Sequence, residues 1–408
     1  MKGNTDFKIN EKLSFATGFD YSQVDMEDYD DNKRNILHRG LSTPFTHRIN
    51  NPATGLPEKG YNGSTPAPDW YEYYYDRGRT TKRSTVFGQL PYRINDSWKV
   101  VAMATNFNRH TRSHSFIKAN EYNGLRDTDE GYSETQRLDL QAYVNYNKRF
   151  NEVHNISATF GTDYMKDKLN SFNASVTGAS SDKVPTLSAG STPGNPTSSV
   201  TDELLISYFG RFNYDFSGKY LFSATVRADG SSKFGPDTRW GYFPAVSAGW
   251  IMTEEDFMSG IGVLNNLKLR ASYGQTGNNS IGLFDSSGSY STSGKYGGNS
   301  TIVTSTIPNL DLKWETTNQL DAGFDAGFFK DKIKFSFDYF NKVTNNLIFS
   351  NPLPNTSGYK SIITNIGKVK FYGVDLELST QNIKTKNFKW TTDFTYSYVM
   401  NRVLELPD

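Results

Sequence analysis

Histidine is the side chain best suited to metal binding and proton transfer near neutral pH, and this sequence contains five of them. Only His110 and His114 are close neighbours, with a spacing of four residues. On a β-strand, residues four apart are separated by about 13 Å, too far for two imidazoles to share one ion. His38, His47 and His154 lie far apart, and nothing in the sequence ties them to a nucleophile. We therefore expect neither a metal site nor a catalytic triad at the histidines.

Two groups of carboxylates could bind an ion or act as acid–base pairs. The first group could supply hard oxygen ligands for Ca²⁺, but it lacks the glycine-centred loop of a calcium-binding hand. The second group consists of sequence neighbours, which seldom converge on one substrate atom. We expect both groups to be solvated loop or turn residues. They are Asp25, Glu27, Asp28, Asp30 and Asp31, and Glu254, Glu255 and Asp256.

Two glycine-rich stretches, residues 229–235 and 274–278, could be mistaken for phosphate-binding loops. Neither ends in the Gly-Lys-Ser/Thr pattern, and neither opens a long helix, so we interpret both as turns. The sequence thus predicts no cofactor site and no enzymatic activity.

An aromatic run is the remaining candidate for a binding site. Its rings could stack on sugar faces or anchor a protein lid, and they could equally pack within a loop or at a strand end. We keep them as candidate ligand or lid contacts: Trp70, Tyr71, Tyr73, Tyr74 and Tyr75.

Composition excludes several classes of protein. The net charge is +1, so no strong field would attract nucleic acid. Mean hydropathy is −0.62, and no apolar stretch approaches the 18 or more residues of a spanning helix. Residues 1–19 do not resemble a secretory signal. Cysteine is absent, which removes disulfides and thiolate metal sites.

The elements that position these residues are predicted by a period-two pattern. In residues 137–147, apolar side chains alternate with polar ones, and the same pattern recurs in segments of about ten residues. Short polar turns alternate with long polar loops. The turns are expected near residues 10–12, 95–97, 149–153, 216–219, 330–332 and 382–387, with a longer helix-like excursion at 253–266. The loops are expected at about 25–83, 111–134, 169–203, 229–239, 277–313 and 348–364.

This rhythm predicts an all-β protein, a transmembrane antiparallel β-barrel with short turns on one rim and long loops on the other. We count about thirteen strands and a remnant at residues 6–9. A soluble β-sandwich is the alternative, because it also alternates apolar and polar residues. Five tryptophans near strand ends fit an interfacial belt, although ordinary sheet packing would also account for them. They are Trp98, Trp240, Trp250, Trp314 and Trp390.

Several stretches, in order along the chain, resemble the barrel domain of SusC/RagA transporters, a group of TonB-dependent receptors. The longest is VRADGSSKFGPDTRWGYFPAVSAGW at residues 226–250. It is followed by LKLRASYGQTGN at 267–278, PNLDLKWETT at 308–317, NPLPNTSGY at 351–359, NIG at 365–367 and GVD at 373–375. Ala228, Phe371 and Tyr372 depart from the family pattern, which affects local packing more than identity.

The resemblance implies a barrel of about 22 strands, preceded by a signal peptide, a TonB box and a plug domain. We therefore expect residues 1–408 to be a partial barrel domain of about 13–14 strands, without the plug, the TonB box, the signal peptide or the C-terminal strands. The implied location is the cell outer membrane, in the lipid bilayer.

The function implied by the resemblance is TonB-dependent active import of nutrient oligomers, either oligosaccharide or peptide. The implied partners are a SusD-like surface lipoprotein and the TonB–ExbB–ExbD complex, which would act through the N-terminal part. A general diffusion porin and a surface adhesion barrel remain the alternatives, and porins would tend to have shorter loops.

Overall fold

The computed structural model describes residues 1–27, 50–57, 68–120 and 124–406. Asp28, Asp30, Asp31, His38 and His47 lie outside the described residues. The strands that form the main sheet in chain order are β1 Lys2–Lys8, β2 Ser14–Glu27, β3 Tyr75–Arg93, β4 Trp98–Ile117, β5 Asp127–Phe150, β6 His154–Thr177, β8 Thr197–Phe216, β9 Tyr220–Ser231, β10 Trp240–Ile251, β11 Leu264–Asn278, β14 Glu315–Phe328, β15 Ile333–Asn345, β18 Lys368–Lys384 and β19 Lys389–Glu405.

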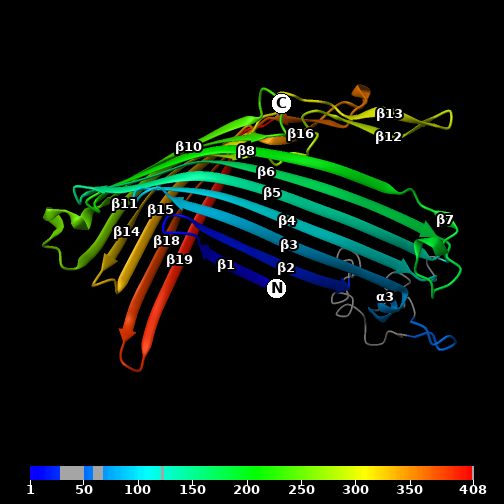
Figure 1. The fold of residues 1–408 in the computed structure, drawn as a ribbon, viewed down its shortest axis with the longest axis horizontal. Helices are drawn as coiled ribbons and strands as arrows, with labels where there is room; N and C mark the ends of the chain where they lie inside the picture. The colour runs from blue at the N-terminus through cyan, green and yellow to red at the C-terminus, as the bar shows by residue number, and fades with distance from the viewer. Residues whose placement is uncertain (28–49, 58–67, 121–123, 407–408) are drawn as a thin grey trace.

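Each of these strands is antiparallel to the next, so the sheet is a continuous meander (Figure 1). The short strand β7, Thr192–Pro193, pairs with β6. Two hairpins stand apart from the sheet, β12–β13 (Ser289–Tyr296 and Asn299–Thr306) and β16–β17 (Ile348–Pro352 and Ser361–Asn365). The fourteen consecutive strands confirm the predicted count.

The main sheet curves strongly and stays open (Figure 1). Within the described residues, no pairing joins β1 to β19. The short helix α3, Pro68–Tyr74, precedes β3. No helix in the described part of the chain is long and apolar enough to cross a bilayer.

The two faces of the sheet differ in polarity, as the alternation predicts. On β5, Leu140 lies beside Ala104 of β4 and Tyr164 of β6, whereas the next residue, Gln141, lies beside Met103 and Asp163 on the opposite face. The registers of β3 through β6 and of β8 through β10 contain no shifts, so the alternation keeps each face uniform.

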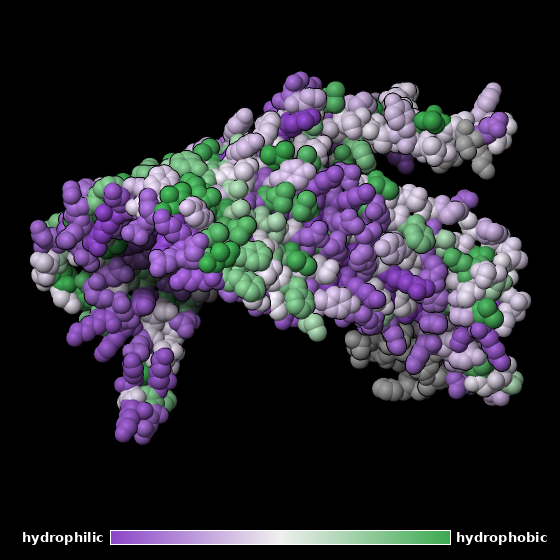
Figure 2. Space-filling model, viewed as in Figure 1, coloured by the Kyte–Doolittle hydropathy of each residue, from purple (hydrophilic) through white to green (hydrophobic). Residues whose placement is uncertain are grey.

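The outer, convex face carries an apolar band. On β5 the band includes Leu138, Leu140, Ala142, Val144 and Tyr146, and polar outward residues, Gln136 and Lys148, bound it. The eight-residue step from Leu138 to Tyr146 spans about 26 Å along the strand, or about 20 Å in height at a tilt of about 40°, slightly less than the apolar height of about 25 Å in outer-membrane barrels. Figure 2 shows the band crossing the strands between hydrophilic regions on either side.

The tight turns of the main sheet gather at one end of the strands (Figure 1). The positive φ angles of Asn151, Glu152 and Ser217 close two of them. The predicted excursion at 253–266 consists of two short 3₁₀ segments, Met252–Glu254 and Asp256–Met258, and β11 already begins at Leu264.

The long loops are shorter than the sequence predicted, because several strands continue well past the apolar band. β3 begins at Tyr75, β4 ends at Ile117 and β5 begins at Asp127, all within regions expected to be loops. Beyond the band both faces of the sheet are polar, so the alternation disappears while the backbone pairing continues.

Four of the five candidate belt tryptophans lie on the outer face near a strand end, and their contact with lipid headgroups stays a prediction. Trp98 packs on Tyr146 with ring centroids 4.6 Å apart, and Trp250 stacks on Tyr220 at 6.4 Å, both on the outer face near the short turns. Trp240 and Trp390 are exposed on the same face. Trp314 is not a belt residue, because only 7% of its surface is exposed and it packs inside the loops of the opposite rim.

Candidate functional site

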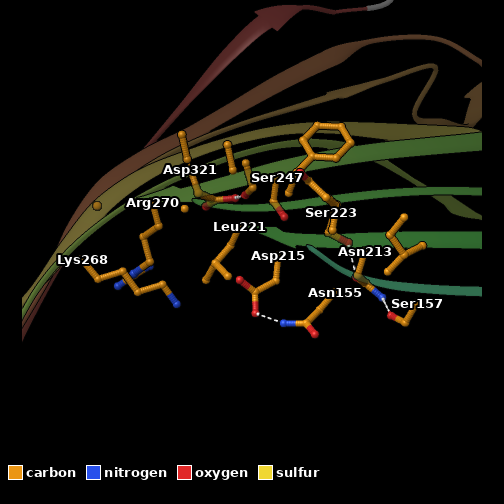
Figure 3. Close-up of a pocket in the computed structure, with 18 of the residues that line it drawn as sticks. Asn155, Ser157, Asn213, Asp215, Leu221, Ser223, Ser247, Lys268, Arg270 and Asp321 are labelled. Carbon is orange, nitrogen blue, oxygen red and sulfur yellow. Dashed lines mark hydrogen bonds between the residues drawn. The ribbon is translucent and has the colours of Figure 1, made fainter. Parts of the chain in front are cut away.

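The concave face of the sheet carries a hollow of about 710 Å³ near the short turns, lined by both polar and apolar residues. Figure 3 shows its side chains pointing from several strands into the concave side. A hydrogen-bond ladder crosses three strands there: Ser223 of β9 and Ser157 of β6 both bond to Asn213 of β8, at 2.8 and 3.0 Å. Asn155 donates to Asp215 at 3.2 Å. The hollow is further lined by Asn147, Arg149, Leu221, Ser247, Lys268, Arg270, Ser272 and Asp321.

Arg270 of β11 organises the charges beside this hollow. Its Nε and Nη2 donate to Asp325 of β14 at 3.1 and 3.2 Å, and Nη2 also donates to Asp338 of β15 at 2.6 Å. Nη1 donates to the other oxygen of Asp338, so the guanidinium bridges three strands. Ser336 donates a short bond to Asp325. These multiple charge-assisted bonds tie β11 to β14 and β15 on the concave face.

A second cluster lies further along the concave face. Arg227 of β9 binds Asp229 through Nε at 2.7 Å and Ser207 of β8 through Nη2 at 2.8 Å, and it approaches Asp163 of β6 to 3.9 Å. Ser207 is fully buried and Asp229 nearly so. Arg227 therefore faces inward, and the residue before it, Val226, faces outward.

The loops at the end of the sheet opposite the short turns form a small core of their own. We call residues 232–239, 279–288 and 307–314 the loop cluster. Its core is built on Leu312, which is fully buried, and on Trp314, whose ring lies 5.3 Å from Phe234 and 5.4 Å from Phe243 of β10. Ile281 completes the core.

Hydrogen bonds tie the members of the loop cluster together. Thr238 donates to the carbonyl of Leu312 at 2.6 Å, and the indole of Trp314 donates to the carbonyl of Arg239 at 2.9 Å. Gly235 passes so close to the backbone of Leu310 that a Cβ there would collide with it. The glycine of the KFGPD stretch is thus required by a close backbone approach.

Asn365 extends the loop cluster to the hairpin β16–β17. Its side-chain amide donates to the carbonyls of Lys313 and Asn346 at 2.8 and 3.0 Å, and its Oδ1 accepts from the backbone N–H of Lys313 at 2.8 Å. Asn309 donates to the carbonyl of Ile363 at 2.8 Å. The stretches that resemble the SusC/RagA pattern at 226–250, 308–317 and 365–367 therefore meet in one place.

The aromatic run forms a compact cluster at the far end of β3, on the side of α3 (Figure 1). Trp70 lies 5.2 Å from Tyr71, 5.0 Å from Tyr74 and 5.7 Å from Tyr75, measured between ring centroids. Trp70 and Tyr71 are buried, and Tyr73 is exposed. The structure thus brings the five predicted residues together, and it leaves their role as ligand or lid contacts a prediction.

The other candidates lie apart. His114 contacts Glu130 at 2.7 Å and His110 contacts Tyr132 at 3.0 Å, all on the outer face beyond the apolar band. Among the described residues, no three histidine or acidic side chains are grouped so that they could hold a metal ion.

In the short turns, Glu255 accepts hydrogen bonds from Tyr220 at 2.6 Å and Trp250 at 3.1 Å. These bonds, together with Lys219, hold the pKa of the Glu255 carboxyl below its usual value. Glu255 therefore has a defined partner set, rather than being the freely solvated turn residue that the sequence predicted.

Sequence analysis did not single out the cluster around Arg270 or the contacts of the loop cluster. The pairing of Arg270 with Asp325 and Asp338 depends on registers across three strands. No signal in a single sequence specifies those registers.

Comparison with known proteins places the chain in a family. A family model described as "TonB dependent receptor-like, beta-barrel" matches residues 7–406. TonB-dependent receptor P3 of Formosa agariphila is 35% identical over 283 residues, which are 68% of this chain and 28% of that protein. TonB-dependent receptor SusC of Bacteroides thetaiotaomicron is 35% identical over 221 residues, 52% of this chain and 22% of that protein. The chain spans less than half the length of these curated relatives.

Solved structures share the curved antiparallel sheet of this chain. The RagAB peptide importer in its 'open-open' state matches with a TM-score of 0.87 and 25% identity, over 99% of this chain and 46% of that one. The siderophore receptor PiuA of Acinetobacter baumannii shares the fold with a TM-score of 0.56 at 13% identity, over 99% of this chain and 56% of that one. The fourteen-strand meander and the family match over residues 7–406 show that this chain belongs to the β-barrel family of the TonB-dependent receptors, as its resemblance to SusC and RagA predicted.

Proposed function

We propose that the complete protein is an active importer of nutrient oligomers in the cell outer membrane, powered by the TonB–ExbB–ExbD complex. The observation that carries this proposal is the difference between the two structural likenesses. The chain matches the RagAB peptide importer with TM-scores of 0.86 to 0.88, and it matches siderophore receptors such as PiuA at 0.56. The likeness is thus stronger to an importer of oligomers than to receptors for small iron chelates.

The concave face supports a second part of the proposal. Residues 1–408 form a section of the barrel wall, and in the complete protein a plug domain packs against the hollow beside Arg270. The hollow is lined by amides, hydroxyls and charges, which can bond to a folded polypeptide or to water. An open pore for passive diffusion would need no such partner.

The long-loop rim supports the third part, in which a SusD-like surface lipoprotein acts as a lid. Beyond the band, β5 continues from Gln136 to Asp127, about 30 Å along the strand, which raises the wall above the bilayer. We propose that Tyr73 is a contact on this rim, held by the ring of Tyr74, whose centroid lies 4.9 Å away, and by Lys118, whose ammonium lies 4.4 Å from the Tyr73 ring. Tyr74 and Tyr75 complete the aromatic platform.

Co-purification tests the lid. The complete protein would be tagged in its native host, and a lipoprotein should co-purify with the wild type and be lost or reduced with Tyr73→Ala. Tyr92→Ala is the matched control, because Tyr92 is similarly exposed, 43% against 39%, but lies at the short-turn rim. A wild type that purifies without any lipoprotein would exclude the lid.

Growth tests the transport. A strain that lacks the gene should fail to grow on a candidate oligomer, and deletion of the TonB box should cause the same failure. If uptake continues without the TonB box, the protein is a diffusion porin. If no oligomer requires the gene while cell attachment does, it is an adhesion barrel.

A further inference from the structure

A set of arginines lies on the concave face of β3 and β4, beyond the apolar band. Arg83 of β3 and Arg109 of β4 are directly opposite each other in the register. Arg77 and Arg79 follow on the same face of β3, because the strand register contains no shift there. Arg83 lies three residues, about 10 Å along the strand, beyond Val86, an outward apolar residue of the band.

These two strands are short of compensating acids. β4 contains no aspartate or glutamate, and the only acid of β3 is Asp76, which alternation places on the outer face. Asp20 of β2, opposite Thr85, is diagonal to Arg83 on the concave face. Within the described residues, neither Arg83 nor Arg109 forms an ion pair, and Arg109 donates only to the hydroxyl of Thr135 at 3.0 Å.

Arg137 shows what a structural arginine looks like on the same face. It is bound in a bidentate pair to Asp167 across the strand, at 2.6 and 2.5 Å. Arg83 and Arg109 are instead exposed and juxtaposed, and like charges directly opposite each other destabilise a sheet. A juxtaposition that costs folding energy and has no carboxylate partner among the described residues indicates a role in binding an anion.

The surroundings of the two arginines are rich in hydroxyl groups. The next concave-face row along the strands contains Thr81, Thr111, Ser133, Ser171 and Ser199, and the last two are hydrogen-bonded to each other at 2.8 Å. On the other side, Phe107 of β4 shares the face with Arg109. Hydroxyls that donate and accept, beside an aromatic ring, suit the hydroxyls and apolar faces of sugars.

We propose that Arg83 and Arg109 form a subsite for an acidic oligosaccharide, one that carries carboxylate or sulfate groups. The guanidinium fork binds such oxyanions in a planar, bidentate geometry. This inference rests on the proposed import of oligomers and adds the chemical class of the cargo.

Direct binding tests the subsite without requiring transport. The complete protein, purified with whatever lipoprotein accompanies it, would be titrated with an oligogalacturonate, a sulfated oligosaccharide, a neutral malto-oligosaccharide and an oligoglutamate. The test variant is Arg83→Gln with Arg109→Gln. The control variant is Lys82→Gln with Arg112→Gln, which removes the same charge from the outer face of the same two strands.

We expect one or both acidic oligosaccharides to bind, with affinity reduced at least about tenfold in the test variant and changed less than about twofold in the control. The loss should shrink at high salt. Equal effects of the two variants, tighter binding of the neutral sugar, or tighter binding of oligoglutamate would each overturn the proposal. Heat-modified mobility in gels verifies that both variants fold. If the growth and co-purification tests give negative results while acidic oligosaccharides still bind as expected, the transport proposal is refuted and the subsite is supported.

Discussion

An arginine placed on the outer face of β5 should destabilise the protein by an amount that depends on its depth in the apolar band. The band on this strand runs from Leu138 to Tyr146, so Ala142 lies at its centre. Leu140 is two residues away, about 7 Å along the strand, or about 5 Å in depth if the strand is tilted by about 40°.

The expected costs follow from this depth. An outward arginine costs about 2–4 kcal/mol at the midplane and about 0–1 kcal/mol near the interfaces. Interpolation gives about 3 kcal/mol for Ala142→Arg, about 2 kcal/mol for Leu140→Arg and about 0.5 kcal/mol for Leu138→Arg. Gln141→Arg is the matched control, because the side chain points to the polar concave face beside Asp163, and it should cost less than about 0.5 kcal/mol.

Urea unfolding of the complete protein in lipid vesicles, followed by tryptophan fluorescence, measures all four values. The reasoning is refuted if Gln141→Arg costs as much as Leu140→Arg, because the two faces would then be equivalent. It is also refuted if the cost does not fall from Ala142 to Leu138, because the band would then not be centred where the sequence and the pairing place it.

Three further predictions concern other parts of the molecule. Because hydrogen bonds from Tyr220 and Trp250 depress the pKa of Glu255, its contribution to stability should be present above the usual carboxyl pKa of 4.5 and be lost as pH falls through the lower folded value. The unfolding midpoint of Glu255→Gln should therefore depend less on pH between 7 and 3 than that of the wild type. Parallel pH profiles of the two proteins would contradict this prediction. Trp314→Ala should lower the local stability of the loop cluster by about 3–5 kcal/mol, which limited proteolysis would show as faster cleavage within residues 307–314 while the sheet stays intact. Unchanged cleavage would show that the core around Leu312 does not depend on the Trp314 ring. The 408-residue chain alone should fail to give monomeric, heat-modifiable channels, because the unpaired edges of β1 and β19 cannot satisfy their backbone groups in lipid, and single-channel conductance from that chain would disprove it.

The sequence predicts the wall of this molecule well where one face meets lipid. The alternation from Leu138 to Tyr146 assigns both faces of β5, and the polar tight turns appear where the strands reverse. Both signals come from short-range chemistry: the bilayer demands apolar side chains on one face, and tight reversals demand residues that adopt turn geometry. The strand count follows from them.

The extent of the strands beyond the bilayer could not be predicted, because water contacts both faces of the sheet there. Polar side chains on both faces then carry no energetic cost, and the alternating pattern is lost. Residues 127–134 therefore read as a loop although they are paired on both sides. Trp314 was misassigned to the belt for a related reason. A tryptophan at a strand end is compatible with headgroup contact and with loop packing, and only its long-range partners Phe234 and Phe243 decide between them.

The loop cluster has a consequence for how relatives of this chain should be compared. Gly235 lies against the backbone of Leu310, Trp314 donates to the carbonyl of Arg239, and Asn365 donates to the carbonyl of Lys313. A substitution at any of these three residues would therefore disturb the loop cluster, whatever molecule the barrel carries. Two importers with different substrates can therefore share these stretches unchanged. Identical residues in these stretches therefore indicate common ancestry and architecture. Differences in substrate are expected instead among inward side chains outside the loop cluster, such as those along β3 and β4.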